Sequence, residues 1–379
     1  MRLGCAFLST LAVALLPTCA WAQAERRVTL DEVLREARLV APDLVVARAQ
    51  EQVAHAEVAV AGVYPNPSAS VGTSTQAAKL SGTLSIPLVV LGQRGAAIDA
   101  AKADEATVKL DTQVAWNDIR QAAVRAYITL WLAEGVADAR RQSAAIEATL
   151  EQSVIQRVQV GSAPELDALR VHAEKLRADD DVLEATAQVT ASGSELGRWM
   201  GIHDGGGLRA GGNVEAPDVA PTLPLLLARL DGNASVRREQ SDARAADARV
   251  DRERALVRPS LGLDVGADLW DPTLLPPGAT GTPPVNYRAA LTFDIPLFNQ
   301  RGGYIDREKA QGDVARARVQ AARVQAAAEL TAAYRTFEAA TARQRTLVDA
   351  VVPASEAAAK ATEEAYTLGR AQLVAVLDA

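Results

Sequence analysis

Two stretches of this chain share one pattern: Leu80-Ser81-Gly82-Thr83-Leu84-Ser85-Ile86-Pro87-Leu88 and Leu291-Thr292-Phe293-Asp294-Ile295-Pro296-Leu297. In each, apolar residues alternate with polar or small ones up to an Ile-Pro-Leu step. A Gln-Arg-Gly step follows each of them, at 93–95 and at 300–302, and a long proline-poor segment comes next. From the arginine onward, matching residues keep a constant offset of 207 positions. A period near half the chain indicates a duplicated unit rather than a solenoid of short repeats.

Period-two alternation in four segments predicts four β-strands, each with one apolar face. The segments pair into two hairpins, at about 66–91 and 259–298. The opposite face carries mostly Asp, Ser, Thr and Gly, which favours a membrane barrel whose apolar side chains face lipid. In that barrel Asp264, Asp268 and Asp294 would face the lumen. The alternative is a pair of edge hairpins in a soluble sheet.

The other segments have the composition of long helices. We predict a first pseudo-repeat over 23–212 and a second over 213–379. The first contains a short helix, its hairpin, a long helix at about 95–158 and a return helix at about 164–200. The second contains a short helix after Asn233, its hairpin and a long helix at about 304–368. Gly161 can take the left-handed conformation that ends a helix, and Ser162 to Glu165 predicts a capping box. A glycine- and proline-rich stretch between the repeats, Gly201 to Pro224, is interpreted as a linker.

The first 22 residues have the features of a signal peptide: Arg2, a short apolar run, and Ala20-Trp21-Ala22 as a cleavage site. An N-terminal membrane anchor and lipidation at Cys19 are the alternatives. The net charge of −7 argues against a nucleic-acid partner. No nucleophile, phosphate-loop or metal-ligand spacing is present, so we expect neither an enzyme nor a bound cofactor or metal.

Four strands cannot close a membrane barrel, and open strand edges in lipid leave backbone groups without hydrogen bonds. The chain must therefore oligomerise. A dimer would supply eight strands and a trimer twelve. Small and acidic lumen residues fill space poorly, which favours the trimer with an open pore. The long helices exceed the bilayer thickness and would project into the periplasm.

These features together resemble the TolC family of outer-membrane efflux proteins, and within it the CzcC-like branch attached to heavy-metal resistance-nodulation-division (RND) pumps. The quoted motifs are the two Ile-Pro-Leu steps, the two Gln-Arg-Gly steps and Tyr366-Thr367-Leu368-Gly369-Arg370. The resemblance implies a mainly α-helical chain with a transmembrane β portion. It also implies a homotrimeric β-barrel joined to a periplasmic α-helical barrel. The function implied is a passive exit duct, docked to an inner-membrane RND pump through a periplasmic adaptor.

The resemblance also implies an acidic constriction at the periplasmic tip, after the glycine that breaks the last long helix, Gly369. Of the two family aspartates, the second falls on Asp378 and the first on Ala375. We expect the weakened ring to form a less cation-selective gate. The matching turn of the first repeat carries Glu165 and Asp167. All three acids can also be read as ordinary exposed carboxylates at helix starts.

The second repeat has no counterpart of the return helix before Ala379, so we expect a fragment or a truncated reading frame that leaves a gap in the helical wall. Alternative functions are a periplasmic coiled-coil adaptor or scaffold, or a truncated efflux protein that does not assemble. The sequence does not say whether the exported substrate is a metal ion or an organic molecule.

Overall fold

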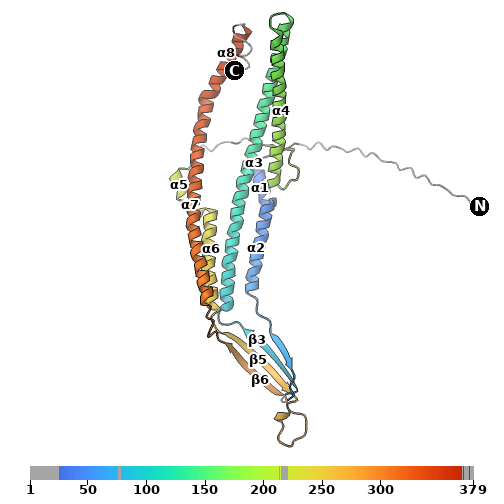
Figure 1. Cartoon of the computed structure of the whole chain (residues 1–379), viewed down its shortest axis with the longest axis vertical. Helices are drawn as coiled ribbons and strands as arrows, with labels where there is room; N and C mark the ends of the chain where they lie inside the picture. Colours follow the sequence, from blue (N-terminus) through green and yellow to red (C-terminus); the bar gives the residue numbers. More distant parts are fainter. Residues whose placement is uncertain are drawn as a thin grey trace, which may run out of the picture.

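The computed structural model describes residues 25–75, 78–212, 214, 221–368, 370 and 375. The signal peptide expected at 1–22, Gly369 and Asp378 lie outside the described residues. The molecule is elongated, with a four-stranded sheet at one end and long helices running away from it (Figure 1).

All four expected strands belong to one antiparallel sheet in the order β2-β3-β5-β6. Their bounds are Ser68–Gly72 for β2, Leu80–Leu88 for β3, Ser260–Leu269 for β5 and Asn286–Asp294 for β6. Within each hairpin the strands pair as neighbours, and β3 also pairs with β5 along nine residues. This β3–β5 pairing joins the two halves of the chain into a single sheet.

Two long helical arms extend from the sheet. In the first arm, α3 runs through Gln93–Gln159 and α4 returns through Glu165–Trp199. In the second arm, α7 spans Gly302–Thr346, a π-helical turn covers Leu347–Val351, and α8 continues through Val352–Thr367. Pro353 explains the wide turn, because it has no N–H and its ring would clash with the carbonyl four residues earlier.

Shorter helices stand beside these arms. They are α1 (Leu30–Val40), α2 (Pro42–Ala61), α5 (Leu223–Leu227) and α6 (Ala234–Ala255), with 3-10 turns at Leu230–Gly232 and Pro272–Leu274. Asn233 caps α6, accepting hydrogen bonds from the Ser235 and Val236 amides. Sequence analysis missed α1, although Thr29 and Glu32 form a complete capping box at its start.

The first half of the glycine-rich stretch interpreted as a linker contains a β-strand, so that interpretation was wrong for this part. β4 (Leu208–Ala210) pairs in parallel with β1 (Arg26–Val28). Gly193 and Gly205 allow the stretch to pack on α4, since a Cβ on Gly193 would lie 2.7 Å from the Gly205 carbonyl oxygen. Glycine is needed here for close approach of two backbones.

The largest buried cluster lies where β1, α1, β4, α3 and α4 meet, midway along the molecule. Val28, Val33, Tyr127, Leu130 and Leu196 belong to it, and each is at most 2% exposed. Close packing of this kind fixes β1 and α1 against the first helical arm. No helix within the described residues is both long and apolar enough to span a bilayer.

Candidate membrane-facing sheet, helix anchors and tip

The strand register places apolar and polar residues on opposite faces of the sheet. The polar face is built from β3 Ser81, Thr83 and Ser85 with their register partners in β5, Asp268, Gly266 and Asp264. The apolar face is built from β3 Leu84, Ile86 and Leu88, β5 Leu261, Leu263 and Val265, and β6 Tyr287, Leu291 and Phe293. The sheet therefore has one polar face and one apolar face, and this division extends across three adjacent strands.

The apolar face is uncovered. Val71 is 78% exposed, Tyr287 80% and Leu291 61%. Among the described elements the four strands pack mainly on each other, and no helix lies over either face. Contiguous exposed apolar surface of this extent indicates a contact with another protein or with a membrane.

The three candidate lumen aspartates lie on the polar face, in different settings. Asp264 accepts hydrogen bonds from the Ser85 hydroxyl of β3 and the Thr292 hydroxyl of β6. Asp268 pairs with Arg288 of β6 at 2.9 Å and is buried. Asp294 is exposed at the helix-proximal end of β6, opposite Ser260. The structure thus places all three on one face, and two of them bridge strands.

The arginine of each Gln-Arg-Gly step anchors a long helix, a role that sequence analysis did not assign. Arg94 donates to the Gly62 carbonyl oxygen at 2.7 Å, just past the end of α2, and lies 4.4 Å over the Tyr64 ring. The preceding residue of the motif, Gln93, donates to the Pro259 carbonyl oxygen at 2.9 Å. The duplicated motif was the available signal, since both copies precede a helix start.

In the second repeat Arg301 donates hydrogen bonds to a carboxylate instead of a backbone carbonyl. Its Nε and Nη2 atoms donate to Glu253 Oε2 at 2.9 and 2.5 Å, and its guanidinium lies 4.6 Å from the Tyr304 ring. Only 3% of the Glu253 side chain is exposed. Burial raises the pKa of Glu253, but its bonds to Arg301 and Arg252 outweigh burial and hold the pKa below its ordinary value.

At the far end of the first arm, Gly161 has a φ of 75°, which an L side chain adopts only with strain. Glu165 and Asp167 sit in the first turn of α4, with Glu165 exposed and Asp167 half-buried. The predicted capping box is wrong, because Ser162 donates its hydroxyl to the Arg157 carbonyl and no side chain caps α4. Pro164, at the N-cap position, orients the chain without a side-chain acceptor.

The second arm touches the first arm near this tip. Tyr366 of α8 packs on the buried pair Val154 and Val171, and Arg157 lies 4.8 Å from its ring. The described residues contain no group of three or more His, Cys, Asp or Glu side chains that could hold a metal ion.

Comparison with known proteins identifies similar efflux proteins. Residues 226–379 match the family model described as outer membrane efflux protein. The chain is 23% identical over 322 residues to the cobalt-zinc-cadmium resistance protein CzcC of Cupriavidus metallidurans, covering 84% of this chain and 75% of CzcC.

Among solved structures, the outer membrane protein VceC from Vibrio cholerae aligns with a TM-score of 0.70 at 18% identity, covering 92% of this chain and 88% of VceC. CusC, whose structures concern transmembrane channel formation, aligns with a TM-score of 0.65 at 17% identity, covering 96% and 88%. The fold is therefore that of outer-membrane channels. The predicted resemblance to TolC-family efflux proteins, and to their CzcC-like branch, is confirmed.

Proposed function

We propose that this chain is one protomer of a homotrimeric exit duct in the bacterial outer membrane, with its helices in the periplasm. The observation that carries the proposal is the uncovered apolar face of the sheet, set against a polar face that holds Asp264, Asp268 and Asp294. In a membrane the apolar face contacts lipid without cost, whereas in water it would remain exposed. The polar face then lines a water-filled passage.

The two outer strands explain the need for more than one copy. β2 and β6 are the edges of the sheet, and each offers a row of unpaired backbone groups. In lipid each unpaired group costs several kcal/mol, so the edges must pair with other copies. Three copies give a twelve-stranded barrel, wide enough to leave a channel rather than a filled interior.

Transport through the duct is passive in this proposal, and the partners are a periplasmic adaptor and an inner-membrane RND pump. The CzcC similarity favours metal cations over organic molecules as the cargo. At the periplasmic tip, Glu165, Asp167 and Asp378 would ring the entrance near the helix breaks at Gly161 and Gly369. Three copies of an exposed carboxylate attract cations into such an entrance.

The experiment measures the oligomeric state of the signal-cleaved protein in detergent and then its conductance in a planar bilayer. We expect a trimer that requires detergent and forms open pores with a preference for cations. A monomer that stays in solution without detergent contradicts the duct and favours the adaptor or scaffold alternative.

A further inference from the structure

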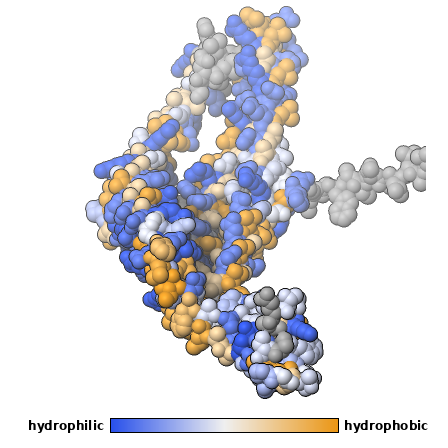
Figure 2. All heavy atoms as spheres, turned by 60° about the horizontal axis from the view of Figure 1, so that its bottom comes forward, coloured by the Kyte–Doolittle hydropathy of each residue, from blue (hydrophilic) through white to orange (hydrophobic). Residues whose placement is uncertain are grey.

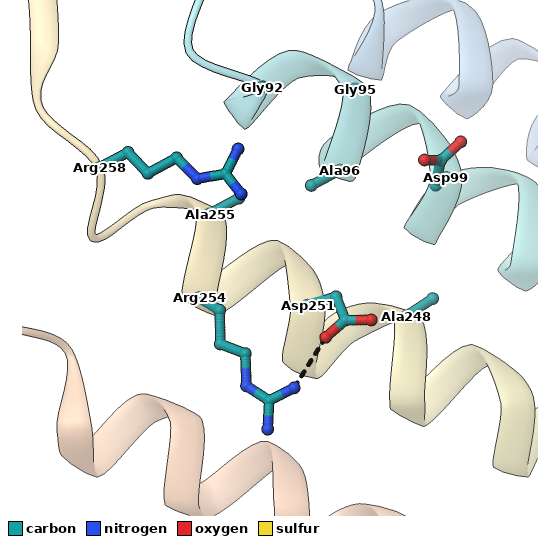
Figure 3. Close-up of a pocket in the computed structure, with 9 residues that line it drawn as sticks. All are labelled: Gly92, Gly95, Ala96, Asp99, Ala248, Asp251, Arg254, Ala255 and Arg258. Carbon is teal, nitrogen blue, oxygen red and sulfur yellow. Dashed lines mark hydrogen bonds and ion pairs between the residues drawn. The ribbon is translucent and has the colours of Figure 1, made fainter.

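A groove of about 460 Å³ lies between the first turns of α3 and the last turns of α6. Gly92 and Gly95 line it on the α3 side, and Ala255 lines it on the α6 side (Figure 3). The small residues leave the backbone accessible. The groove sits where the helices meet the sheet, since α3 begins and α6 ends beside the strands.

Four charged side chains line the groove, and two of them neutralise each other. Arg254 pairs with Asp251 at 2.9 Å. Arg258 donates to the Leu91 carbonyl oxygen at 2.7 Å and makes no ion pair with any described residue. Asp99 makes neither a hydrogen bond nor an ion pair within the described part of the chain. One cation and one anion therefore remain open to a ligand.

These open charges have a fixed order along the molecular axis. Arg258 lies at the sheet end of the groove, next to the start of α3. No side chain caps α3, so its first N–H groups add positive potential at the same end. Asp99 follows Gly95 by one helical turn, about 6 Å further from the sheet. Positive potential thus comes first and negative charge second, moving away from the sheet.

Exposed apolar residues adjoin the groove-lining residues along the chain. Leu91 is 36% exposed and Leu256 is 40% exposed, and each belongs to a segment that lines the groove. Val90, two residues before Gly92, is 67% exposed. Figure 2 shows apolar residues gathered where the helices meet the sheet. An acyl chain lying on the apolar face of the sheet would lead its headgroup into the groove.

We propose that the groove binds the headgroup of a bilayer phospholipid that carries a phosphate followed by a primary ammonium, as in phosphatidylethanolamine. Arg258 and the α3 N–H groups hold the phosphate, and Asp99 accepts hydrogen bonds from the ammonium. The order of charges in the groove matches the order in the lipid, from tail to phosphate to ammonium. A glycerol headgroup brings no cation for Asp99, and a trimethylated ammonium has no N–H to donate.

This inference rests on the proposed function, because it requires the apolar face to lie in a bilayer. The test uses the delipidated full chain in detergent, titrated with short-chain phosphatidylethanolamine, phosphatidylcholine and phosphatidylglycerol, with native mass spectrometry as the readout. We expect phosphatidylethanolamine to bind about tenfold more tightly than the other two lipids. Asp99→Asn should remove that preference, and Arg258→Gln should weaken all three lipids.

Matched controls are Arg343→Gln and Asp349→Asn, two exposed residues of the second arm far from the groove. They should leave lipid binding unchanged. Asp99 has no partner to lose among the described residues, so Asp99→Asn should keep the wild-type circular dichroism spectrum, which separates a loss of preference from misfolding. Inorganic phosphate and free ethanolamine serve as competitors, and neither should displace the lipid at equal concentration.

Equal binding of the three lipids, or an unchanged preference in Asp99→Asn, overturns the inference. Nitroxide lipids that quench a fluorescent label on a cysteine introduced at position 287 separate the two proposals. If the lipids quench the fluorescence but none of them is preferred, the lipid-binding proposal is overturned and the exit-duct proposal stands. If they do not quench it, both proposals are overturned.

Discussion

The matching arginines of the two repeats bind different acceptors. Arg94 in the first repeat bonds to a backbone carbonyl, whereas Arg301 in the second repeat bonds to the buried carboxylate of Glu253. Both arginines also lie over a tyrosine ring, Tyr64 or Tyr304. Both copies therefore keep the arginine, but the tyrosine beside it comes from a different position in each, before the hairpin for Tyr64 and three residues after the arginine for Tyr304. Of the two arginines, Arg301 is the one that pairs with a buried carboxylate. A buried pair is costly to break and contributes little net stability while intact.

The largest effect is expected from breaking this pair. Arg301→Ala should destabilise the protein by about 3–5 kcal/mol, because Glu253 would remain buried without its main partner. Arg94→Ala should cost about 1 kcal/mol, since a carbonyl loses one hydrogen bond. Thermal unfolding of the detergent-solubilised protein measures both. The double variant Arg301→Ala/Glu253→Gln should recover part of the loss, and equal losses in the two single variants would contradict the comparison.

A second comparison concerns the long helices. α3 is continuous past Ile146, whereas the matching position of the second repeat is Pro353, beside the π-helical turn. Ile146→Pro should therefore destabilise the first arm by about 3 kcal/mol. Pro353→Ala should have a smaller effect and slow amide hydrogen exchange at Leu347–Val351. Exchange that stays fast in Pro353→Ala would show that proline does not cause the turn.

The two anchors should also respond differently to pH. The pKa of Glu253 is held below 4.5, so its contribution to stability is present above the unfolded value and is lost as the pH falls through the lowered value. The Arg94 anchor bonds to a carbonyl and has no such dependence. The unfolding temperature of Arg94→Ala should fall in acid as steeply as that of the wild type, and that of Arg301→Ala/Glu253→Gln less steeply. Parallel acid profiles in all three would argue against this role of Glu253.

The smallest effect is expected at Glu147, which is matched by Ala354 in the second repeat. Burial, followed by repulsion from Glu174, raises the pKa of Glu147, and its Oε2 atom has no hydrogen-bond partner among the described residues. A raised carboxylate pKa means that stability falls as the pH rises from 4.5 through the folded value. Glu147→Ala should therefore unfold at a slightly higher temperature at pH 8 and show less change between pH 4 and pH 8. If Glu147→Ala unfolds at a lower temperature than the wild type at pH 8, the ionised Glu147 carboxylate does not destabilise the folded protein.

The sequence carried much of the fold because period-two alternation and missing prolines are local signals. The β2–β3 and β5–β6 hairpins and the course of α3 follow from them. The β3–β5 pairing, the β1–β4 pair and the packing of Gly205 on α4 depend on contacts between distant segments, which no local pattern records.

The candidate site divides in the same way. Alternation alone placed Asp264, Asp268 and Asp294 on one face, but their partners Ser85, Thr292 and Arg288 required the strand register. The anchors at Arg94 and Arg301 were visible as a repeated motif without a known role. Their bonds to Gly62 and Glu253 cross between helices, so chain spacing could not predict them.

The most direct test of the central claim is a single-cysteine scan along β6, read by fluorescence quenching in liposomes. We expect nitroxide lipids to quench labels at 287, 289, 291 and 293, and a water-soluble agent to quench labels at 288, 290 and 292. Loss of this alternation, with every position reached equally by the water-soluble agent, would contradict the assignment of the sheet to a membrane.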